Sequence, residues 1–153
     1  SLQPYAAVEI FKEPEKLAGF NAENIRKARK VRDGADNMLQ LVAKHNVETF
    51  AGADLWQEGI ITKTPEDMVL RKRWFKDVEI LRQNTSYAAK WLAKSGTKNP
   101  YREGPLGVIE EGAYADMLLV EGNPVNDVNI HADWEHTIRL IMKDGEIYKN
   151  TIN

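Results

Sequence analysis

Asp54 is the residue of this sequence that is best placed to do chemistry. It ends a β-prone stretch, residues 48–54, in which Thr49 and Phe50 favour a strand and Gly52 lets the backbone bend or be approached closely. A helical pattern precedes this stretch and another follows it, which is an order typical of buried parallel strands. Parallel sheets bind substrates at the carboxyl ends of their strands. The pattern therefore indicates a carboxylate at a site-forming edge.

The same carboxylate also has a structural interpretation. An Asp after a strand often caps the next turn or accepts hydrogen bonds from loop amides. The loop that follows, residues 57–65, is long enough to cover a site beside Asp54. Trp56 and the Ile60-Ile61 pair either line such a pocket or pin the loop down. Spacing alone leaves these alternatives open.

The three histidines are placed where structural roles are expected. His45 lies in the last turn of a predicted helix, where the helix dipole favours a cation. His131 and His136 lie in a polar stretch between predicted strands, and nothing in the sequence fixes them as metal ligands. We therefore expect a helix cap and a surface loop.

Basic side chains also gather on a later predicted helix. Arg71, Lys72 and Arg73 carry the charge needed to bind a substrate carboxylate, but such a run more often forms a solvated helix face. We therefore assign no ligand to these three residues.

The composition limits the possible functions. The 153 residues are 42% hydrophobic, which is enough for one ordinary domain with a core. The net charge of -2 produces no overall field that would attract nucleic acid or an acidic membrane, and no apolar run is long enough to span a bilayer. Because the chain has no cysteine, a metal would need oxygen and nitrogen ligands. We expect neither nucleic acid nor a membrane as a partner.

Helical patterns on both sides of residues 48–54 would position Asp54. Residues 22–45 repeat apolar side chains at helical spacing after Asn21, a typical N-cap. Before them, residues 1–5 are interpreted as the end of an earlier strand, because Pro4 stops a helix from passing through.

The second helical pattern begins after the loop. Thr64 is expected to be its N-cap, and apolar residues continue at helical spacing through residues 68–94. Polar residues 84–86 interrupt this pattern, so we expect a helix break there, with side chains that satisfy the amides of the next helix.

The pattern changes after residues 95–100, which have the composition of a linker. Asp144-Gly145 is a strong signal for a two-residue β-hairpin. We therefore divide the chain into residues 1–100 and residues 101–153, the second being an antiparallel β unit. Its predicted strands are residues 108–109, 116–120, 138–142 and 146–148.

The β unit contains a long motif. Residues 107–124 read GVIEEGAYADMLLVEGNP and residues 141–148 read IMKDGEIY. Both closely resemble the C-terminal end of the metal-dependent amidohydrolase superfamily, nearest to its imidazolonepropionase-like and prolidase-like branch. Residues 83–92, QNTSYAAKWL, resemble the last barrel helix of that family. Residues 50–55, FAGADL, are similar to its final barrel strand, with Ala53 in place of a hydroxyl residue.

The resemblance implies an α/β fold. Residues 1–100 would form the C-terminal portion of a TIM (β/α)8 barrel, with its last two strands and helices, and residues 101–153 part of a small β-sandwich. It also implies a hydrolase of amide or peptide-like C–N bonds, in which a divalent metal, typically zinc, activates water. Asp54 would be both catalytic and a metal ligand, and Trp56 and Gln57 would belong to a substrate loop.

On this resemblance the chain is a C-terminal fragment of the enzyme, because the family's histidine ligands have no counterpart in it. A catalytic metal is usually held by about three protein ligands, so we expect the chain alone to bind no metal and to be inactive. The parent would act on a small molecule or a dipeptide-like substrate, and the chain would associate with the missing part of the barrel or with itself. The alternative is a non-catalytic α+β interaction module, which would be monomeric and unfold cooperatively.

Overall fold

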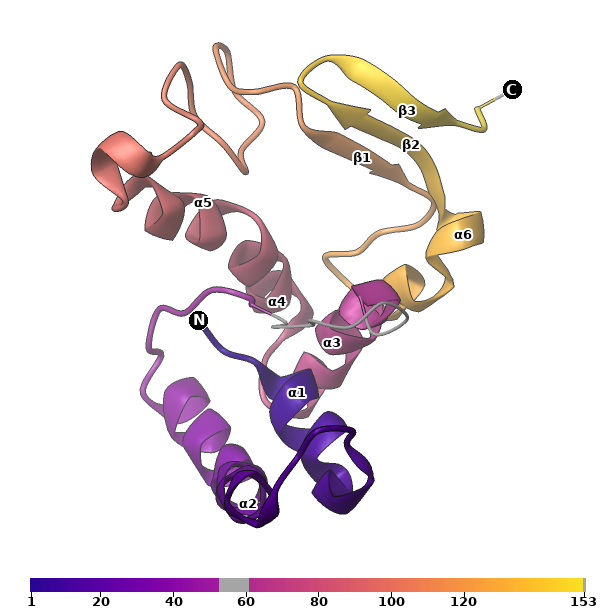
Figure 1. The fold of residues 1–153 in the computed structure, drawn as a ribbon. Coiled ribbons are helices and arrows are strands. Elements are labelled where there is room, and N and C mark those ends of the chain that lie inside the picture. Colours follow the sequence, from indigo (N-terminus) through magenta and orange to yellow (C-terminus); the bar gives the residue numbers. More distant parts are fainter. Residues whose placement is uncertain (53–60, 153) are drawn as a thin grey trace.

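A computed structural model of the protein describes residues 1–52 and 61–152. The described residues are mainly helical until the last third of the chain, where a three-stranded sheet forms (Figure 1). The helical elements before the sheet are α1 (Pro4–Val8), η1 (Ile10–Lys12), η2 (Pro14–Lys16), α2 (Ala22–Lys44), η3 (Ile61–Lys63), α3 (Thr64–Leu70), η4 (Arg71–Arg73), α4 (Asp77–Asn84), α5 (Ser86–Ala93) and η5 (Gly96–Lys98), the η elements being short 3₁₀ turns.

Helix α2 has the ends that its sequence predicts. The side chain of Asn21 caps the first turn, with Oδ1 accepting a hydrogen bond from the amide of Asn24 at 2.9 Å. His45 follows the last helical residue, and Asn46 then adopts a left-handed φ of 50°. The amide of Val47 donates to the carbonyl of Val42 at 3.1 Å, which satisfies a carbonyl at the helix end.

Helix α1 packs against α2, and both helices carry buried alanines. Ala6 and Ala7 are buried on α1, as are Ala28 and Ala35 on α2, and such small residues let two helices approach closely.

The strand expected over residues 1–5 is wrong beyond Gln3, because α1 begins at Pro4. Pro4 opens a helix, because its fixed φ suits the first helical turn.

The break predicted near residues 84–86 is confirmed at Thr85, which has φ -126° and ψ -98° and separates α4 from α5. The expected capping of amides is wrong. Asn84 Nδ2 donates to the carbonyl of Ile80 at 2.8 Å, and Thr85 Oγ1 donates to that of Leu81 at 2.7 Å. Both side chains thus satisfy carbonyls at the end of α4 rather than amides at the start of α5.

The sheet consists of β1 (Met117–Val120), β2 (Ile138–Lys143) and β3 (Glu146–Asn150), paired antiparallel in the order β1-β2-β3. The predicted hairpin is confirmed: Lys143 pairs with Glu146, and Asp144 and Gly145 both have positive φ, as a type I′ turn requires. The strand expected at residues 108–109 is wrong, and Ile109 is 95% exposed.

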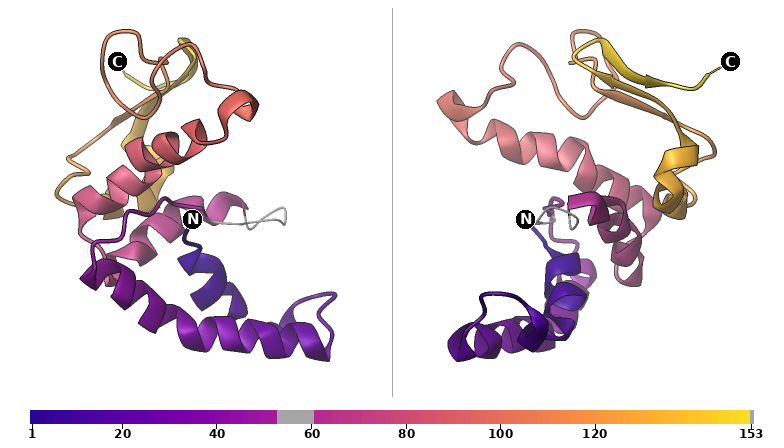
Figure 2. Two further views of the ribbon diagram at one scale, coloured as in Figure 1. Left: turned by 90° about the vertical axis from the view of Figure 1, so that its left-hand side faces the viewer. Right: turned by 45° about the vertical axis from the view of Figure 1, so that its right-hand side comes forward.

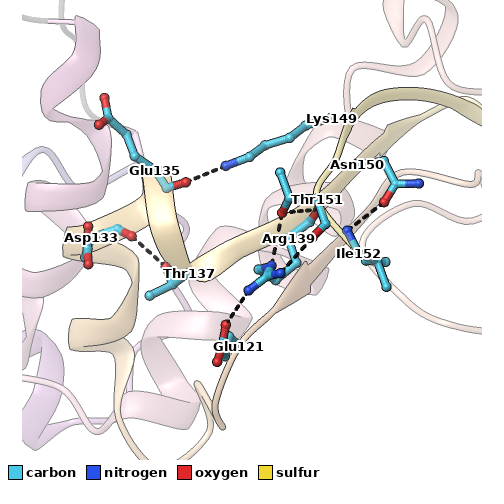
Figure 3. Close-up of polar contacts among 9 residues, drawn as sticks. All are labelled: Glu121, Asp133, Glu135, Thr137, Arg139, Lys149, Asn150, Thr151 and Ile152. Carbon is cyan, nitrogen blue, oxygen red and sulfur yellow. Dashed lines mark hydrogen bonds and ion pairs between the residues drawn. The ribbon is translucent and has the colours of Figure 1, made fainter.

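Between β1 and β2 the chain forms η6 (Val128–Asp133) and α6 (Trp134–Thr137). Arg139 on β2 ties the end of the chain to the sheet (Figure 3). Its guanidinium donates to the carbonyl of Thr151 at 2.6 Å and to the carboxylate of Glu121 at 2.9 Å. Lys149 reaches the carbonyl of Glu135 at 2.7 Å, so β3 is also linked to α6.

The sheet and α2 lie at opposite ends of the molecule, with α3, α4 and α6 between them (Figures 1 and 2). Helix α3 contacts η6, which joins the helical and sheet-forming parts. Gly107 makes a second connection, to the break between α4 and α5. It has φ 73°, and a Cβ atom there would lie 2.7 Å from the carbonyl carbon and oxygen of Thr85, so only glycine fits.

Candidate functional site

Asp54, Trp56 and Gln57, the residues predicted to form the site, lie outside the described residues. The structure does describe the backbone that leads to them, up to Gly52. The position and surroundings of that backbone define the base of the candidate site.

The backbone before Asp54 makes a parallel pairing with the start of the chain. Leu2 and Ala51 form a parallel bridge, in which the amide of Leu2 donates to the carbonyl of Phe50 at 3.0 Å and the amide of Gly52 donates to that of Leu2 at 3.1 Å. The parallel direction agrees with the sequence, but the described part of residues 48–54 forms this single bridge rather than a full strand.

Gly52 is approached closely, as predicted. A Cβ atom on Gly52 would lie 2.9 Å from Cβ of Ser1, which is nearer than real side chains come. The two segments therefore run side by side as far as Gly52, the last residue described before Asp54.

Arg71 is the centre of a buried polar cluster beneath this pairing. Its side chain is 0% exposed. Its Nη2 donates to the carbonyl of Leu2 at 2.8 Å, its Nε to Oδ2 of Asp67 at 2.8 Å, and its Nη1 to Oε1 of Gln83 at 3.1 Å. Burial lowers the pKa of Arg71, and the neighbouring Asp67 carboxylate opposes this shift.

Asp67 carries the cluster on to the first turn of α1. Its Oδ1 accepts a hydrogen bond from the amide of Tyr5 at 3.0 Å, so this carboxylate joins α3 to α1 while it balances the charge of Arg71. The Tyr5 hydroxyl donates to Glu66 at 3.1 Å. Burial and this hydrogen bond raise the pKa of Tyr5 to about 12, which keeps its hydroxyl protonated as a donor.

Gln83 holds the other side of the pairing. Its backbone carbonyl accepts a hydrogen bond from the amide of Ala51 at 2.9 Å, and its side-chain Nε2 donates to Oγ1 of Thr49 at 3.4 Å. On the far side, Phe50 packs against Trp91 of α5 with ring centroids 5.5 Å apart, and Lys90 pairs with Glu48 at 2.7 Å. Residues 48–52 are thus anchored to α4 and α5 as well as to the chain start.

The solvated helix face expected for Arg71 is wrong, and so is the alternative of a direct substrate contact, because the side chain has no exposed surface and its guanidinium hydrogen-bonds within the protein. Arg71 instead holds the carbonyl of Leu2, which also accepts the amide of Gly52 two residues before Asp54. The i,i+4 spacing of Asp67 and Arg71 was the sequence signal for this pair. The neighbouring Lys72 and Arg73 do remain at the surface, paired with Asp127 at 2.8 Å and Glu9 at 3.4 Å.

The histidines do not come together as metal ligands. Within residues 1–52 and 61–152 there is no group of three or more His, Asp or Glu side chains that could hold a metal ion. His136 is exposed, and its Nδ1 lies 2.6 Å from Asp133, an interaction that raises the pKa of His136. The surface position expected for His131 is wrong, because this side chain is buried. The described residues also include no helix that is long and apolar enough to cross a membrane.

No protein-family model and no curated protein matches the sequence. Solved structures do resemble the fold. An amidohydrolase matches 99% of this chain with a TM-score of 0.80 and 24% identity. A prolidase complexed with N-methylphosphonate-L-proline matches 87% of it with a TM-score of 0.69 and 27% identity, and a Xaa-Pro dipeptidase with bound methionine in the active site matches 97% with 0.72 and 23%.

The chain spans about a third of the length of these structures, namely 34%, 30% and 34% of the three chains. The resemblance found in residues 107–124 and 141–148 is therefore confirmed over nearly the whole chain at the level of the fold. The protein has the fold of about one third of an amidohydrolase of the kind that includes prolidases.

Proposed function

We propose that this chain supplies the Asp54 carboxylate of an amidohydrolase active site that cleaves amide or peptide-like C–N bonds. Asp54 would accept a proton from the attacking water and pass it to the leaving amine. The Leu2–Ala51 pairing supports this role, since it holds the backbone three residues before Asp54 in parallel with a second segment. Trp56 and Gln57, which follow Asp54 directly, would contact the substrate from the loop.

A divalent metal, zinc in our proposal, would when bound lower the pKa of the attacking water and polarise the scissile carbonyl. The described residues do not fit such a metal on their own, because no cluster of ligands exists among them. The remaining ligands would come from a portion of the barrel beyond this chain, and Asp54 would be the contribution of this chain. Arg71, Asp67 and Gln83 would act as positioning residues that hold the backbone leading to Asp54.

The substrate would be a dipeptide-like compound. One structural relative is a prolidase complexed with N-methylphosphonate-L-proline, and another is a Xaa-Pro dipeptidase. We take an Xaa-Pro dipeptide as the first compound to assay, because its C–N bond is of the type that this proposal requires.

The partner would be the rest of a TIM barrel and β-sandwich, with residues 1–100 completing the barrel and residues 101–153 completing the sandwich. Exposed apolar side chains on the sheet support this assembly. Leu118 and Leu119 on β1 are 54% and 51% exposed, and Ile147 and Tyr148 on β3 are also exposed. A self-sufficient interaction module would be expected to bury such a surface, so the exposure favours a chain that needs a partner.

The test compares the chain alone with a chimera in which it replaces the matching third of the structurally similar prolidase. The chain alone should neither retain zinc after dialysis nor hydrolyse Xaa-Pro dipeptides. The chimera should retain zinc and hydrolyse the dipeptides, and Asp54→Asn should lower its hydrolysis by at least about 100-fold. Asp144→Asn is the matched control, since Asp144 lies in the exposed β2–β3 turn and asparagine tolerates its positive φ. Zinc bound tightly by the chain alone would contradict the proposed division of ligands.

A further inference from the structure

Helix α2, at the end of the molecule away from the sheet (Figures 1 and 2), exposes a row of apolar side chains. Val31, Met38 and Leu41 are 49%, 42% and 46% exposed. Together with Gly34 they follow one another at spacings of three or four residues, so they share one face of the helix. We call these four residues the α2 stripe. About half of each of its side chains is open to a partner.

Gly34 leaves a notch in the α2 stripe. Glycine inside a helix costs about 0.5–1 kcal/mol relative to alanine. Its φ is not positive, and apart from the backbone of the helix itself no described atom lies within 4 Å of the place that a Cβ atom would take. Nothing in the described parts of the chain therefore requires glycine here. A large side chain of a partner that packs directly on the backbone would require it.

A small hollow of about 230 Å³ lies at the amino end of the stripe. The rings of Phe11 and Phe20 form part of its wall, with their centroids 6.2 Å apart. The hollow is smaller than the usual small-molecule site, but it suits one apolar anchor side chain of a protein partner. Its lining residues are Phe11, Phe20, Asn24, Lys27, Ala28 and Val31.

A row of cations runs along one side of the stripe. Arg26 and Lys30 are one helical turn apart, and Lys44 lies about four turns further along the same side. All three are exposed, and none of them forms an ion pair with another residue of ranges 1–52 and 61–152. The neighbouring Lys27, by contrast, is paired with Glu23 at 2.7 Å. We call Arg26, Lys30 and Lys44 the basic flank.

We propose that the α2 stripe is the docking face of a partner helix whose own apolar stripe is flanked by aspartate or glutamate. Such a helix buries the α2 stripe, places a large side chain over Gly34 and pairs its carboxylates with the basic flank. Charges beside an apolar seam of this kind select the partner and set its orientation.

A second copy of this chain fits the face poorly. In an antiparallel pair of α2 stripes the two basic flanks face each other and repel. In a parallel pair each flank faces the opposite edge of the other stripe, where α2 carries Ala28, Ala35 and Val42 and no carboxylate. Both arrangements leave the cations uncompensated, so the charges favour a different, acidic helix.

An anionic membrane also attracts cations, but this face is narrow for one. Helices that lie in a membrane interface bury a broad apolar face, often with aromatic residues in it. The α2 stripe offers only Val31, Met38 and Leu41, and Gly34 interrupts it, while the buried residues of α2 are Ala28, Ala35 and Leu39. A single helix seated along the stripe matches this width.

In the assembly proposed above, the acidic helix would belong to the rest of the barrel, and to this extent the inference rests on the proposed function. This chain spans 34% of the amidohydrolase that it resembles, so an assembly of that size includes much further chain. Docking on the stripe needs neither Asp54 nor a metal. A test of docking can therefore fail while the chimera hydrolyses dipeptides, and the chimera can fail while docking is observed.

Two designed peptide helices of about 20 residues, similar in length to α2, serve as probes. They share one leucine-rich stripe and differ only in the flanking residues, which are glutamate in one and lysine in the other. Fluorescence anisotropy measures the affinity of the full chain for each, and the methyl NMR signals of Met38 on α2 and Met142 on β2 locate the contact. The glutamate peptide should bind at least about tenfold more tightly and shift the Met38 signal.

Exchanging the charge of the flank tests its role. A chain with Lys30→Glu and Lys44→Glu should prefer the lysine peptide, a reversal that a loss of folding could not produce. The control carries Lys98→Glu and Arg102→Glu, which change the net charge equally at exposed positions outside α2, and it should keep the original preference. Gly34→Ala should weaken binding of the glutamate peptide by about fivefold or more, because its Cβ fills the notch.

Three results would overturn the proposal. The first is an unchanged preference in the Lys30→Glu, Lys44→Glu chain. The second is a shift at Met142 without one at Met38, which would place the peptide on the sheet. The third is binding of the chain to vesicles of phosphatidylcholine and phosphatidylserine with no binding of the glutamate peptide, which would assign the face to a membrane.

Discussion

Arg71 has no exposed surface, and the carboxylate that hydrogen-bonds to its guanidinium and balances its charge is that of Asp67. Three of its nitrogens bond to Leu2, Asp67 and Gln83. A buried ion pair of this kind is sensitive to the loss of one partner, because the other charge is then left without compensation.

Replacing Arg71 by methionine should therefore lower the free energy of unfolding by about 3–5 kcal/mol. Arg73→Met is the matched control, two positions away on the same turn. Arg73 is largely exposed and pairs with Glu9 at 3.4 Å, so its loss should cost at most about 0.5 kcal/mol. Urea unfolding followed by far-UV circular dichroism measures both. Equal losses in the two variants would show that the buried cluster does not anchor the fold.

His131 gives the stability a pH dependence. Burial lowers its pKa in the folded protein from 6.5, so the unfolded chain takes up a proton first as the pH falls. Stability should therefore decline from about pH 6.5 downwards, and His131→Phe should reduce this decline. His136 acts in the opposite sense, since its pKa is raised in the folded state by Asp133 and its contribution is lost as the pH rises through that raised value.

The pH measurement is best made in a His136→Gln background, which removes the opposing contribution. Unfolding free energies at about pH 7.5 and about pH 5.5 are compared with and without His131→Phe. A decline of the same size in both proteins would mean that His131 is not the group being titrated.

At the scale of elements, two glycines show how differently the same substitution acts in a helix and in a tight contact. Gly34 lies inside α2 with open space around the position of a Cβ atom, so Gly34→Ala should raise the free energy of unfolding by about 0.5–1 kcal/mol. Gly107→Ala should lower it by about 1–3 kcal/mol, because φ is 73° there and the new Cβ would meet the Thr85 carbonyl. Thermal or urea unfolding of both variants decides the matter, and stabilisation by both would refute the predicted contact.

Elements whose signals are local were predictable from the sequence. The Asn21 cap, the end of α2 next to His45 and the Asp144-Gly145 hairpin each depend on residues within one turn of each other. The burial of Arg71 was not predictable in this way, since its partners Leu2 and Gln83 lie 69 and 12 residues away along the chain. The same reason explains His131, whose burial results from packing between η6 and α3.

The candidate site was predictable in part. The close approach at Gly52 and the parallel direction of the pairing followed from residue types and element order. The roles of Asp67, Arg71 and Gln83 beneath it did not, because a buried charge has the same sequence appearance as an exposed one until its partners are placed.

At the scale of the whole molecule, β1 is an edge strand with apolar side chains exposed, and unpaired edges of this kind promote association. The isolated chain should therefore associate in a concentration-dependent way, and Leu119→Lys should reduce this association. Leu41→Lys on α2 is the control, since Leu41 is similarly exposed but lies away from the sheet. Sedimentation velocity at several concentrations measures the effect. A strictly monomeric wild-type chain would favour the self-sufficient interaction module.

The catalytic role of Asp54 is the central claim, and the kcat/KM of the prolidase chimera for an Xaa-Pro dipeptide tests it most directly. With zinc bound to both proteins, Asp54→Asn should lower kcat/KM by about 100-fold to 10,000-fold, the range expected when a general base is removed. Asp144→Asn should leave it within about twofold, as expected for a surface substitution away from the site. A chimera that hydrolyses the dipeptide equally well with Asn at position 54 would contradict the account.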